Sequence, residues 1–419
     1  MKFLKRYFIG DTYIWLIYIA LCAWSAIVMF SASSALAYKA NSYMDPVISH
    51  MSFLAIGIAI VMLGQIMPRN LVRYGGIILC WISIVMLIAV LFIGVSDNNI
   101  NARWLNILGF QFQPSEFGKL ALILTLAHYM STIHDSQSES KNYKIAFGYI
   151  ICICGLIVFT NLSTAILLFA VSLTMMFVSG LPFFKRILLP IVIIAAIGVC
   201  GYFIVKVTPY ESMPSILRRS YTWVGRIDRF MDKENEEDKY TVTDENIQEI
   251  YSQLAIAKGG LIGVGPGNSV ERDFLPLAYA DYIYAIIVEE FGSIGGIIII
   301  MLYLSLLFRA GYLANRMKNS YDSIAIMGLA SMITYQALLN ICVATNTGPV
   351  TGQPLPLISH GGTSIVLTSC YFAIIMCLQR HNKLEEEEEK AATEDAQLVT
   401  VQDLPEEEEL PTEEILEEK

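Results

Sequence analysis

Long apolar runs decide most of what this chain can fold into. Ten of them lie near residues 13–36, 47–67, 73–95, 115–131, 145–160, 164–181, 187–207, 282–308, 322–345 and 362–380. Several reach the ~20 residues that a helix needs to cross a hydrocarbon core about 30 Å thick. Because lipid accepts only helices or closed barrels, and no strand-like alternation is present, we expect an all-α fold. The sequence therefore predicts a polytopic membrane protein with about ten transmembrane helices.

The distribution of Lys and Arg predicts how these helices are oriented. One set of short loops, together with the N-terminus, carries nearly all the basic residues, whereas the other short loops hold only Lys39 and Arg103. Basic loops stay on the cytoplasmic side, so both termini are expected to be cytoplasmic. The connections at 95–114, 208–281 and 346–361 then face outward. The one at about 208–281, between helices 7 and 8, is the largest outer loop.

The C-terminal residues 384–419 differ from the membrane domain at 1–383. They contain the acidic runs Glu385–Glu389 and Glu406–Glu409, which dominate the net charge of −10. A segment with so few aromatic residues cannot bury a core, so we expect a disordered cytoplasmic tail. Its role, as a solvated tail or as a docking segment, stays open. The acidity implies no basic partner for the membrane domain, and no nucleic-acid partner is expected.

Three segments are polar or rich in Gly and Pro where a membrane protein is usually apolar. They lie at 101–116, 263–281 and 349–362, and the predicted topology places all of them on the outer face. Irregular backbone near a membrane is tolerated where it is buried in protein or lines a cavity. The sequence therefore predicts one convergent site at the outer surface.

The first segment contains two pairs of residues, each with alternative interpretations. Glu116 and Lys119 lie three residues apart at a helix start, where they can form a local ion pair or line a polar cavity. Arg103 and Trp104 can anchor the chain at the membrane interface or contact the phosphate and a ring of a ligand.

The second segment combines a glycine-rich turn with a carboxylate. The turn runs from Gly263 to Ser269 and lacks the features of a P-loop or a dinucleotide fingerprint. Asp281 begins an apolar span, where it can be a helix N-cap or a functional acid. Glu289 and Glu290 follow about 12 Å further along a continuous helix, a depth at which carboxylates need partners.

The third segment and the outer loop supply further candidates. Pro349–Gly362 is rigid and re-entrant in character, and it contains Ser359 and His360. A lone histidine is more typical of a hydrogen-bonding role than of a metal site. Arg226 in the outer loop has a guanidinium that matches phosphate oxygens, although nearby acids also fit a solvated loop with internal ion pairs.

These segments resemble the SEDS family of bacterial cell-wall proteins, which includes FtsW and RodA. The resemblance runs from about Thr12 to Arg380, and four segments carry it: Ala102-Arg-Trp-Leu with Phe112-Gln-Pro-Ser-Glu-Phe-Gly-Lys119, Gly263-Val-Gly-Pro-Gly-Asn-Ser269, Asp281-Tyr-Ile-Tyr with Glu289-Glu-Phe-Gly292, and Pro349–Gly362. The form of the glycine turn and the long tail favour the FtsW branch. Four such segments in the same order are highly specific.

The resemblance implies a peptidoglycan glycosyltransferase with ten membrane helices in the bacterial inner membrane. It implies polymerisation of lipid II at the outer face in septal cell-wall synthesis, together with a class B penicillin-binding protein and other division proteins. The family's essential acid falls on Asp281. Its other site positions make candidate substrate contacts of Arg103, Trp104, Glu116, Lys119, Arg226, Asn268, Ser269, Ser359 and His360.

Some positions depart from the family pattern. An acidic position reads Asn161, the His-Thr before the acid reads Tyr279-Ala280, and the usual Tyr of Ser-Tyr-Gly-Gly reads His360. No cofactor is implied with certainty, although a divalent cation (Mg or Mn) is a candidate to neutralise pyrophosphate. The alternatives are a lipid II flippase, disfavoured because polar residues gather mainly outside, and a non-enzymatic division scaffold.

Overall fold

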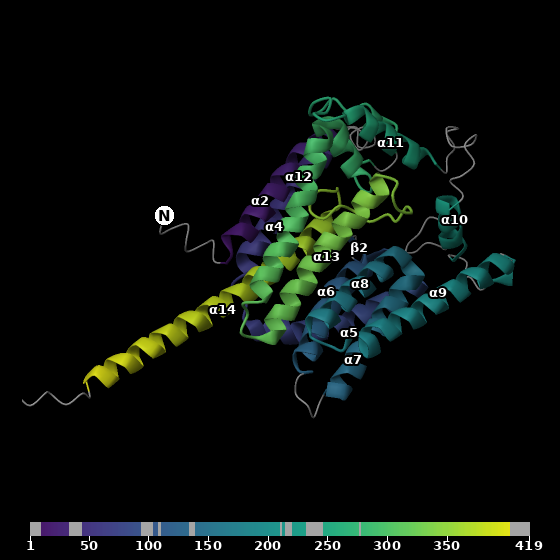
Figure 1. The fold of residues 1–419 in the computed structure, drawn as a ribbon. Coiled ribbons are helices and arrows are strands. Elements are labelled where there is room, and N and C mark those ends of the chain that lie inside the picture. The colour runs from purple at the N-terminus through teal and green to yellow at the C-terminus, as the bar shows by residue number, and fades with distance from the viewer. Residues whose placement is uncertain are drawn as a thin grey trace, which may run out of the picture.

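A computed structural model describes residues 10–32, 44–93, 104–107, 110–133, 139–209, 212–213, 220–231, 246–275 and 278–402. The described part is almost entirely helical (Figure 1). Its long helices are α2 (Thr12–Ala32), α4 (Met44–Gly64), α5 (Arg69–Ile93), α6 (Pro114–Ser131), α7 (Glu139–Thr160), α8 (Leu162–Val178), α9 (Leu189–Val207), α12 (Ile283–Ala314), α13 (Ser320–Ala344) and α14 (Gly362–Gln402).

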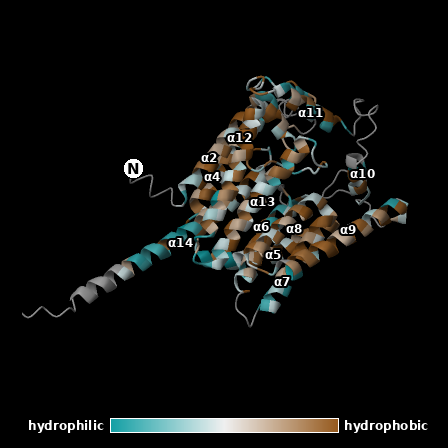
Figure 2. Cartoon of the chain, viewed as in Figure 1, coloured by the Kyte–Doolittle hydropathy of each residue, from teal (hydrophilic) through white to brown (hydrophobic). Residues whose placement is uncertain are grey.

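These helices confirm the predicted all-helical membrane fold. In the described residues, eight helices are long and apolar enough to cross a membrane, and α8 is apolar but shorter. Helix α6 corresponds to the fourth apolar run, but it carries the Glu116–Lys119 ion pair and is not one of these eight helices. The count of ten membrane spans therefore stays a prediction. Figure 2, a ribbon coloured by residue hydropathy, shows hydrophobic residues along most of the helices and hydrophilic residues on the part of α14 that leaves the bundle.

Helix α13 forms the centre of the bundle. It packs against α6, α8, α12 and α14, and most of its side chains are buried. Helix α9 lies at the edge of the bundle in Figure 1, with Pro190 and Val205 as its buried residues. The π-helical turn η1 (Phe183–Leu188) leads into α9. Polar groups held against α13 are therefore shielded, whereas α9 leaves one flank of the bundle open.

Several short elements connect the long helices. Strands β1 (Leu105–Ile107) and β2 (Phe110–Phe112) pair antiparallel and lead into α6, a hairpin that the all-helical prediction lacked. The outer loop between α9 and α12 contains α10 (Ser220–Met231), α11 (Ile247–Gly259) and the 3₁₀ turn η4 (Glu271–Asp273). Helix α11 packs on α12.

The C-terminal segment corrects one prediction. Helix α14 continues through the acidic run to Gln402, so the expectation of disorder from Leu384 is wrong for residues up to that point. Ala, Glu, Lys and Gln are strong helix formers, and a helix already begun in the membrane needs no new nucleus. Ion pairs of Arg69 with Glu385 and of Lys318 with Glu389 hold the first part of this extension. Residues 403–419 lie outside the described part.

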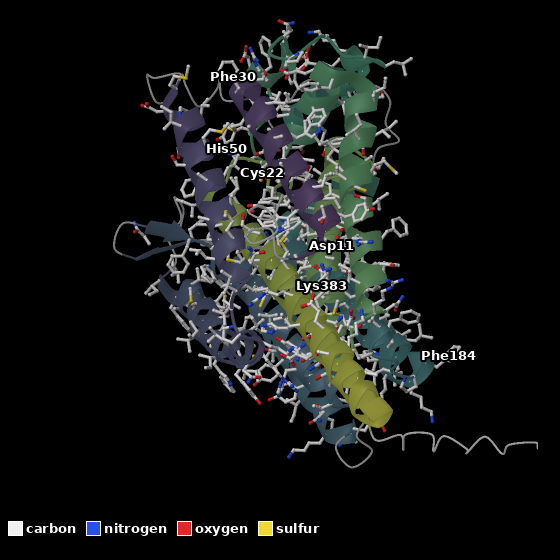
Figure 3. All side chains as sticks on the ribbon, turned by 90° about the vertical axis from the view of Figure 1, so that its left-hand side faces the viewer. Asp11, Cys22, Phe30, His50, Phe184 and Lys383 are labelled. Atoms are coloured by element: carbon white, nitrogen blue, oxygen red, sulfur yellow. The ribbon has the colours of Figure 1, made fainter. Side chains whose placement is uncertain are left out.

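Figure 3 gives the vertical order of several residues in the bundle. Asp11 and Lys383 lie toward one end, Phe30 lies toward the other, and His50 lies between these levels. The predicted topology makes the Asp11 end cytoplasmic. The outer end of the bundle is therefore the end at which α2 finishes and α4 begins.

Candidate functional site

The segment Pro349–Gly362 holds the chain on which Asp281 lies. Ser359 Oγ donates a hydrogen bond to the Ala280 carbonyl (2.6 Å), and the His360 amide donates to the Tyr279 carbonyl (2.8 Å). Both bonds reach backbone oxygens immediately before Asp281. The second and third polar segments of the sequence therefore meet, and Ser359 acts here through the backbone.

Two side-chain amides, of Asn340 and Gln353, join Ser359 and His360 in a hydrogen-bonded cradle around the backbone at Asp281. Asn340 of α13 donates through Nδ2 to the carbonyls of Asp281 (2.7 Å) and Gln353 (2.8 Å). Gln353 in turn donates to Thr164 Oγ1 at the start of α8 (2.7 Å). Because all these residues except Asp281 are buried, the bonds fix the backbone of Asp281 in a shielded setting.

Asp281 itself is less buried than the side chain that binds its backbone carbonyl. Asp281 is partly exposed and precedes Tyr282, which occupies the N-cap position of α12, so the N-cap interpretation of Asp281 is wrong. Burial raises the pKa of the nearby Tyr279 hydroxyl, and the negative charge of Asp281 adds to that rise. The Tyr282 hydroxyl lies within electrostatic reach of Glu249, Asp281 and Arg226. A carboxylate and an arginine therefore share one small region.

Arg226 joins this region to a cavity of about 760 Å³. Its guanidinium donates to the Val350 carbonyl (3.0 Å), which belongs to the third polar segment. The cavity lies between α8, α10 and α13, and its lining is mostly apolar. Among the described lining residues, Arg226 is the one that carries a charge. Such a cavity can hold a hydrocarbon chain beside an anionic group.

Helix α12 is two helices joined at Gly292, which has φ 71° and ψ −177°. In a straight helix, Tyr284 and Gly296 would be roughly 18 Å apart. A Cβ at Gly296 would instead lie 2.7 Å from the Tyr284 hydroxyl and 2.9 Å from a methyl of Val288. The chain therefore doubles back at Gly292, and residues 283–291 pack along the following turns.

This reversal corrects the expected depth of Glu289 and Glu290. Glu290 accepts a hydrogen bond from Ser31, at the outer end of α2. The His360 ring, whose residue binds the Tyr279 carbonyl, lies beside His50 of α4, about 9 Å in from that helix's outer start at 1.5 Å per residue. The segment carrying Asp281 is therefore the deeper one, because the continuous-helix assumption fails at Gly292.

The glycine-rich turn supports this reversal instead of joining the Asp281 cluster. The amides of Val264 and Gly265 donate to the carbonyls of Glu289 (2.9 Å) and Glu290 (3.0 Å). Ser269, which is buried, donates to the Glu289 carboxylate (2.5 Å). Asn268 is exposed and donates to the Val264 carbonyl (3.2 Å). The structure thus gives Asn268 a partner inside the turn and Ser269 a partner at Glu289.

Lys119 is fully buried and forms an ion pair with Glu116 (2.6 Å). It also donates to Gln336 Oε1 (2.9 Å), and Gln336 donates to the Pro354 carbonyl (3.0 Å). The structure contains the local ion pair of the first interpretation and links it through Gln336 to the third polar segment, while the second interpretation, a polar cavity lined by this pair, stays a prediction. With no exposed surface, Lys119 can act on a ligand only through that segment.

Two other predicted contacts are less defined. Trp104 is 40% exposed at the start of the hairpin. Arg103 lies outside the described residues, and its role stays a prediction. Among the described residues no group of three or more His, Cys, Asp or Glu side chains could hold a metal ion. The divalent cation therefore stays a prediction without a protein cage in that part of the chain.

Two departures from the family pattern contact each other. The Tyr279 and His360 rings pack edge to face with centroids 5.9 Å apart, and the His360 ring stacks with His50 at 5.8 Å. Burial lowers the pKa of His360. Asn161, a third departure, caps α8 by accepting from the Thr164 amide (3.3 Å).

Several residues of the cradle were not singled out from the sequence: Thr164, Gln336, Asn340 and Gln353. A usable signal existed for Gln336 and Asn340, because buried amides inside a membrane span are costly without partners. Their partners come from residues distant in sequence, which no local pattern reveals.

Comparison with known proteins places this fold and site in a family. Residues 11–384 match the FtsW/RodA/SpoVE family, described as cell cycle protein. The probable peptidoglycan glycosyltransferase FtsW of Dichelobacter nodosus is 34% identical over 68% of this chain and 67% of its own length. The peptidoglycan glycosyltransferase MrdB of Escherichia coli K12 is 30% identical over 88% of this chain and 93% of its own.

A solved structure has the same fold. One chain of a peptidoglycan synthase complex superposes with a TM-score of 0.69 over 90% of this chain and 99% of its own, at 22% identity. The family match covers nearly all of the membrane domain, including every segment that builds the cradle. This chain belongs to the FtsW/RodA/SpoVE family of cell cycle proteins.

Proposed function

We propose that this protein is a peptidoglycan glycosyltransferase that polymerises lipid II at the outer face of the bacterial inner membrane. The observation that carries the proposal is the position of Asp281, partly exposed on a backbone fixed by Ser359, His360 and Asn340. Relatives named as peptidoglycan glycosyltransferases support the choice of reaction. Septal synthesis during cell division is the role we favour, in line with the relatives named FtsW.

In the proposed reaction Asp281 is the general base. It takes the proton from the 4-hydroxyl of the acceptor sugar, whose oxygen forms a bond to C1 of the lipid-linked donor. The bond from C1 to the pyrophosphate oxygen breaks, and undecaprenyl pyrophosphate leaves with the electron pair. One direct displacement inverts the configuration at C1, by analogy with inverting glycosidases. A positioned base contributes about 10²- to 10⁴-fold.

Arg226 is the cation best placed to stabilise the leaving pyrophosphate. It lines the cavity and remains partly exposed, whereas Lys119 is buried and already paired with Glu116. The apolar walls of that cavity suit the first part of the undecaprenyl chain. A divalent cation could be carried in by the pyrophosphate itself, in which case the protein needs no cage for it.

The partner we propose is a class B penicillin-binding protein, which would cross-link the strands that this protein makes. The likeness to a chain of a peptidoglycan synthase complex supports this partner. We further propose that both termini are cytoplasmic and that other division proteins bind the complex. The positive residues at the Asp11 end of the bundle support this orientation.

Lipid II polymerisation by purified protein tests the proposal, alone and with a class B penicillin-binding protein. Wild-type protein should make glycan chains, and Asp281→Asn should make at least 10²-fold fewer while unfolding at the same temperature. Asn keeps the size of the side chain but cannot take the proton. Equal chain formation by both proteins would remove Asp281 from the mechanism.

The same preparation separates the alternatives. A flippase would move lipid II across vesicle membranes without making chains. A non-enzymatic scaffold would make no glycan chains even as the wild-type protein. Because a scaffold would depend on its tail, removal of residues 384–419 would abolish cell division. Under our proposal this deletion spares polymerisation.

A further inference from the structure

We propose that Ser25 and His50 are positioning residues for the glycosyl transfer, acting through a strained turn at Leu357 that aligns Asp281. This inference rests on the proposed function. Neither residue is near Asp281 in sequence: Ser25 lies on α2 and His50 on α4. Both side chains are fully buried.

The turn at Leu357 adopts an unfavourable backbone conformation. Leu357 has φ 65°, in the left-handed region that a branched side chain rarely adopts, and its side chain is buried. Strain of this kind persists where surrounding contacts over-determine it, and it clusters at functional sites. The surrounding contacts are therefore the key to what the turn does.

Two hydroxyl groups hold the strained turn from outside. Ser25 Oγ donates to the Leu357 carbonyl (2.7 Å), and the Tyr303 hydroxyl donates to the Pro356 carbonyl (2.6 Å). Inside the turn, the Leu355 amide donates to Ser359 Oγ (2.7 Å). Each contact involves buried groups, so loss of one leaves an unsatisfied polar atom and is costly.

His50 fixes the direction of the Ser25 hydroxyl. His50 Nε2 lies 2.7 Å from Ser25 Oγ. The single hydroxyl proton of Ser25 is used toward the Leu357 carbonyl, so the histidine must donate from Nε2. His50 thereby orients Ser25, and Ser25 orients the turn.

The turn transmits this alignment directly to the base. The next residues, Ser359 and His360, donate to the carbonyls of Ala280 (2.6 Å) and Tyr279 (2.8 Å). The His360 ring also lies between the rings of His50 and Tyr279. A shift at Leu357 therefore moves the backbone that carries Asp281, and catalysis is sensitive to displacements of about 1 Å.

The test is a kinetic rescue in the full-length protein. Ser25→Ala should lower kcat for lipid II polymerisation about tenfold with KM nearly unchanged, and it should also lower the unfolding temperature because the buried Leu357 carbonyl loses its partner. Leu357→Gly in the Ser25→Ala background should restore kcat, because glycine adopts the left-handed conformation freely. A residue with a merely structural role would lower the unfolding temperature alone, leaving kcat of the folded protein unchanged and insensitive to a more flexible turn.

Histidine variants provide a second arm that does not depend on Ser25. His50→Gln keeps a donor near the position of Nε2 and should retain most activity, whereas His50→Leu should match Ser25→Ala. Ser83→Ala is the control, because Ser83 is buried and its hydroxyl has no hydrogen-bond partner among the described residues. It should leave kcat unchanged.

The outcomes separate this inference from the proposed function. Absence of chains from wild-type protein would refute the proposed function. An active wild type whose Ser25→Ala variant equals the Ser83→Ala control would overturn the inference alone. So would a loss that Leu357→Gly does not restore, or His50→Leu with wild-type kcat.

Discussion

Gly292 offers the sharpest test of the reversed architecture of α12. The perturbation is Gly292→Ala, which adds a single methyl group. A Cβ at this position would lie 2.1 Å from the carbonyl oxygen of Leu261, and the backbone has φ 71°. Real Cβ atoms do not approach backbone oxygens this closely, so the segment around Leu261 must move.

The cost follows from the conformation and from the bonds at this crossing. A non-glycine residue in this region of φ and ψ costs about 2 kcal/mol. Four backbone hydrogen bonds join the segments at 2.9–3.3 Å, with donors Val264, Gly265, Ser293 and Ile294. Each contributes about 1 kcal/mol net. Loss of two bonds gives a total of roughly 4 kcal/mol.

Thermal unfolding in detergent, followed by polymerisation of lipid II, measures this effect. Gly75→Ala is the matched control, because it is the same change inside α5, where a new Cβ meets no atom within 4 Å. Alanine is the better helix former, so this control should be neutral or stabilised by up to about 1 kcal/mol. If Gly292→Ala unfolds at the same temperature as Gly75→Ala and keeps full activity, the reversal at Gly292 is refuted.

Three further predictions concern charged groups. Lys119→Met should lower the unfolding free energy by about 3 to 5 kcal/mol because it leaves Glu116 buried and unpaired. Adding Glu116→Gln should recover much of this loss in the same unfolding assay. A Lys119→Met variant as stable as wild type would contradict the ion pair. Arg226→Ala should lower kcat/KM about 10- to 100-fold in steady-state polymerisation, because a charged hydrogen bond contributes about 1.5–3 kcal/mol. Arg226→Lys should retain more activity. Equal activity of wild type and both variants would exclude a contact between Arg226 and pyrophosphate. Burial alone would raise the pKa of Asp11, but the hydrogen bonds that Arg309 donates to it prevail, and the pKa lies below its ordinary value of 3.8. The stability that wild type gains over Asp11→Asn should therefore be complete above pH 3.8 and disappear as the pH falls through the lowered pKa. Unfolding measured from pH 7 down to about pH 1 checks this, and a constant difference over that range would be the contrary result.

Most of the fold could be predicted from the apolar runs, because burial in lipid is decided locally. The ninth run, predicted at 322–345, is helix α13 at Ser320–Ala344, and the seventh, at 187–207, contains α9 at Leu189–Val207. The error at Gly292 has a definite cause. Apolar helices often contain glycine, so the sequence pattern alone predicted that the helix continues through Gly292.

The candidate site was predictable as a set of segments but not as a set of contacts. The polar segments at 263–281 and 349–362 were identified because they interrupt apolar sequence. The hydrogen-bond partner of each polar residue within these segments could not be predicted. Ser269 serves the Glu289 carboxylate, while Ser359 serves the backbone before Asp281. Both are serines in glycine-rich turns, and sequence alone cannot distinguish them.

The sequence by itself determined that this chain crosses a membrane as helices and concentrates its polar segments between particular spans. These properties depend on the free energy of each stretch in lipid or water, which the local composition sets. The tertiary structure alone decided which polar groups meet. Ser25 reaches Leu357, Lys119 reaches Gln336, and Asn340 reaches Asp281. Buried polar groups must find partners, and only the packing of the helices brings such distant residues within hydrogen-bond distance.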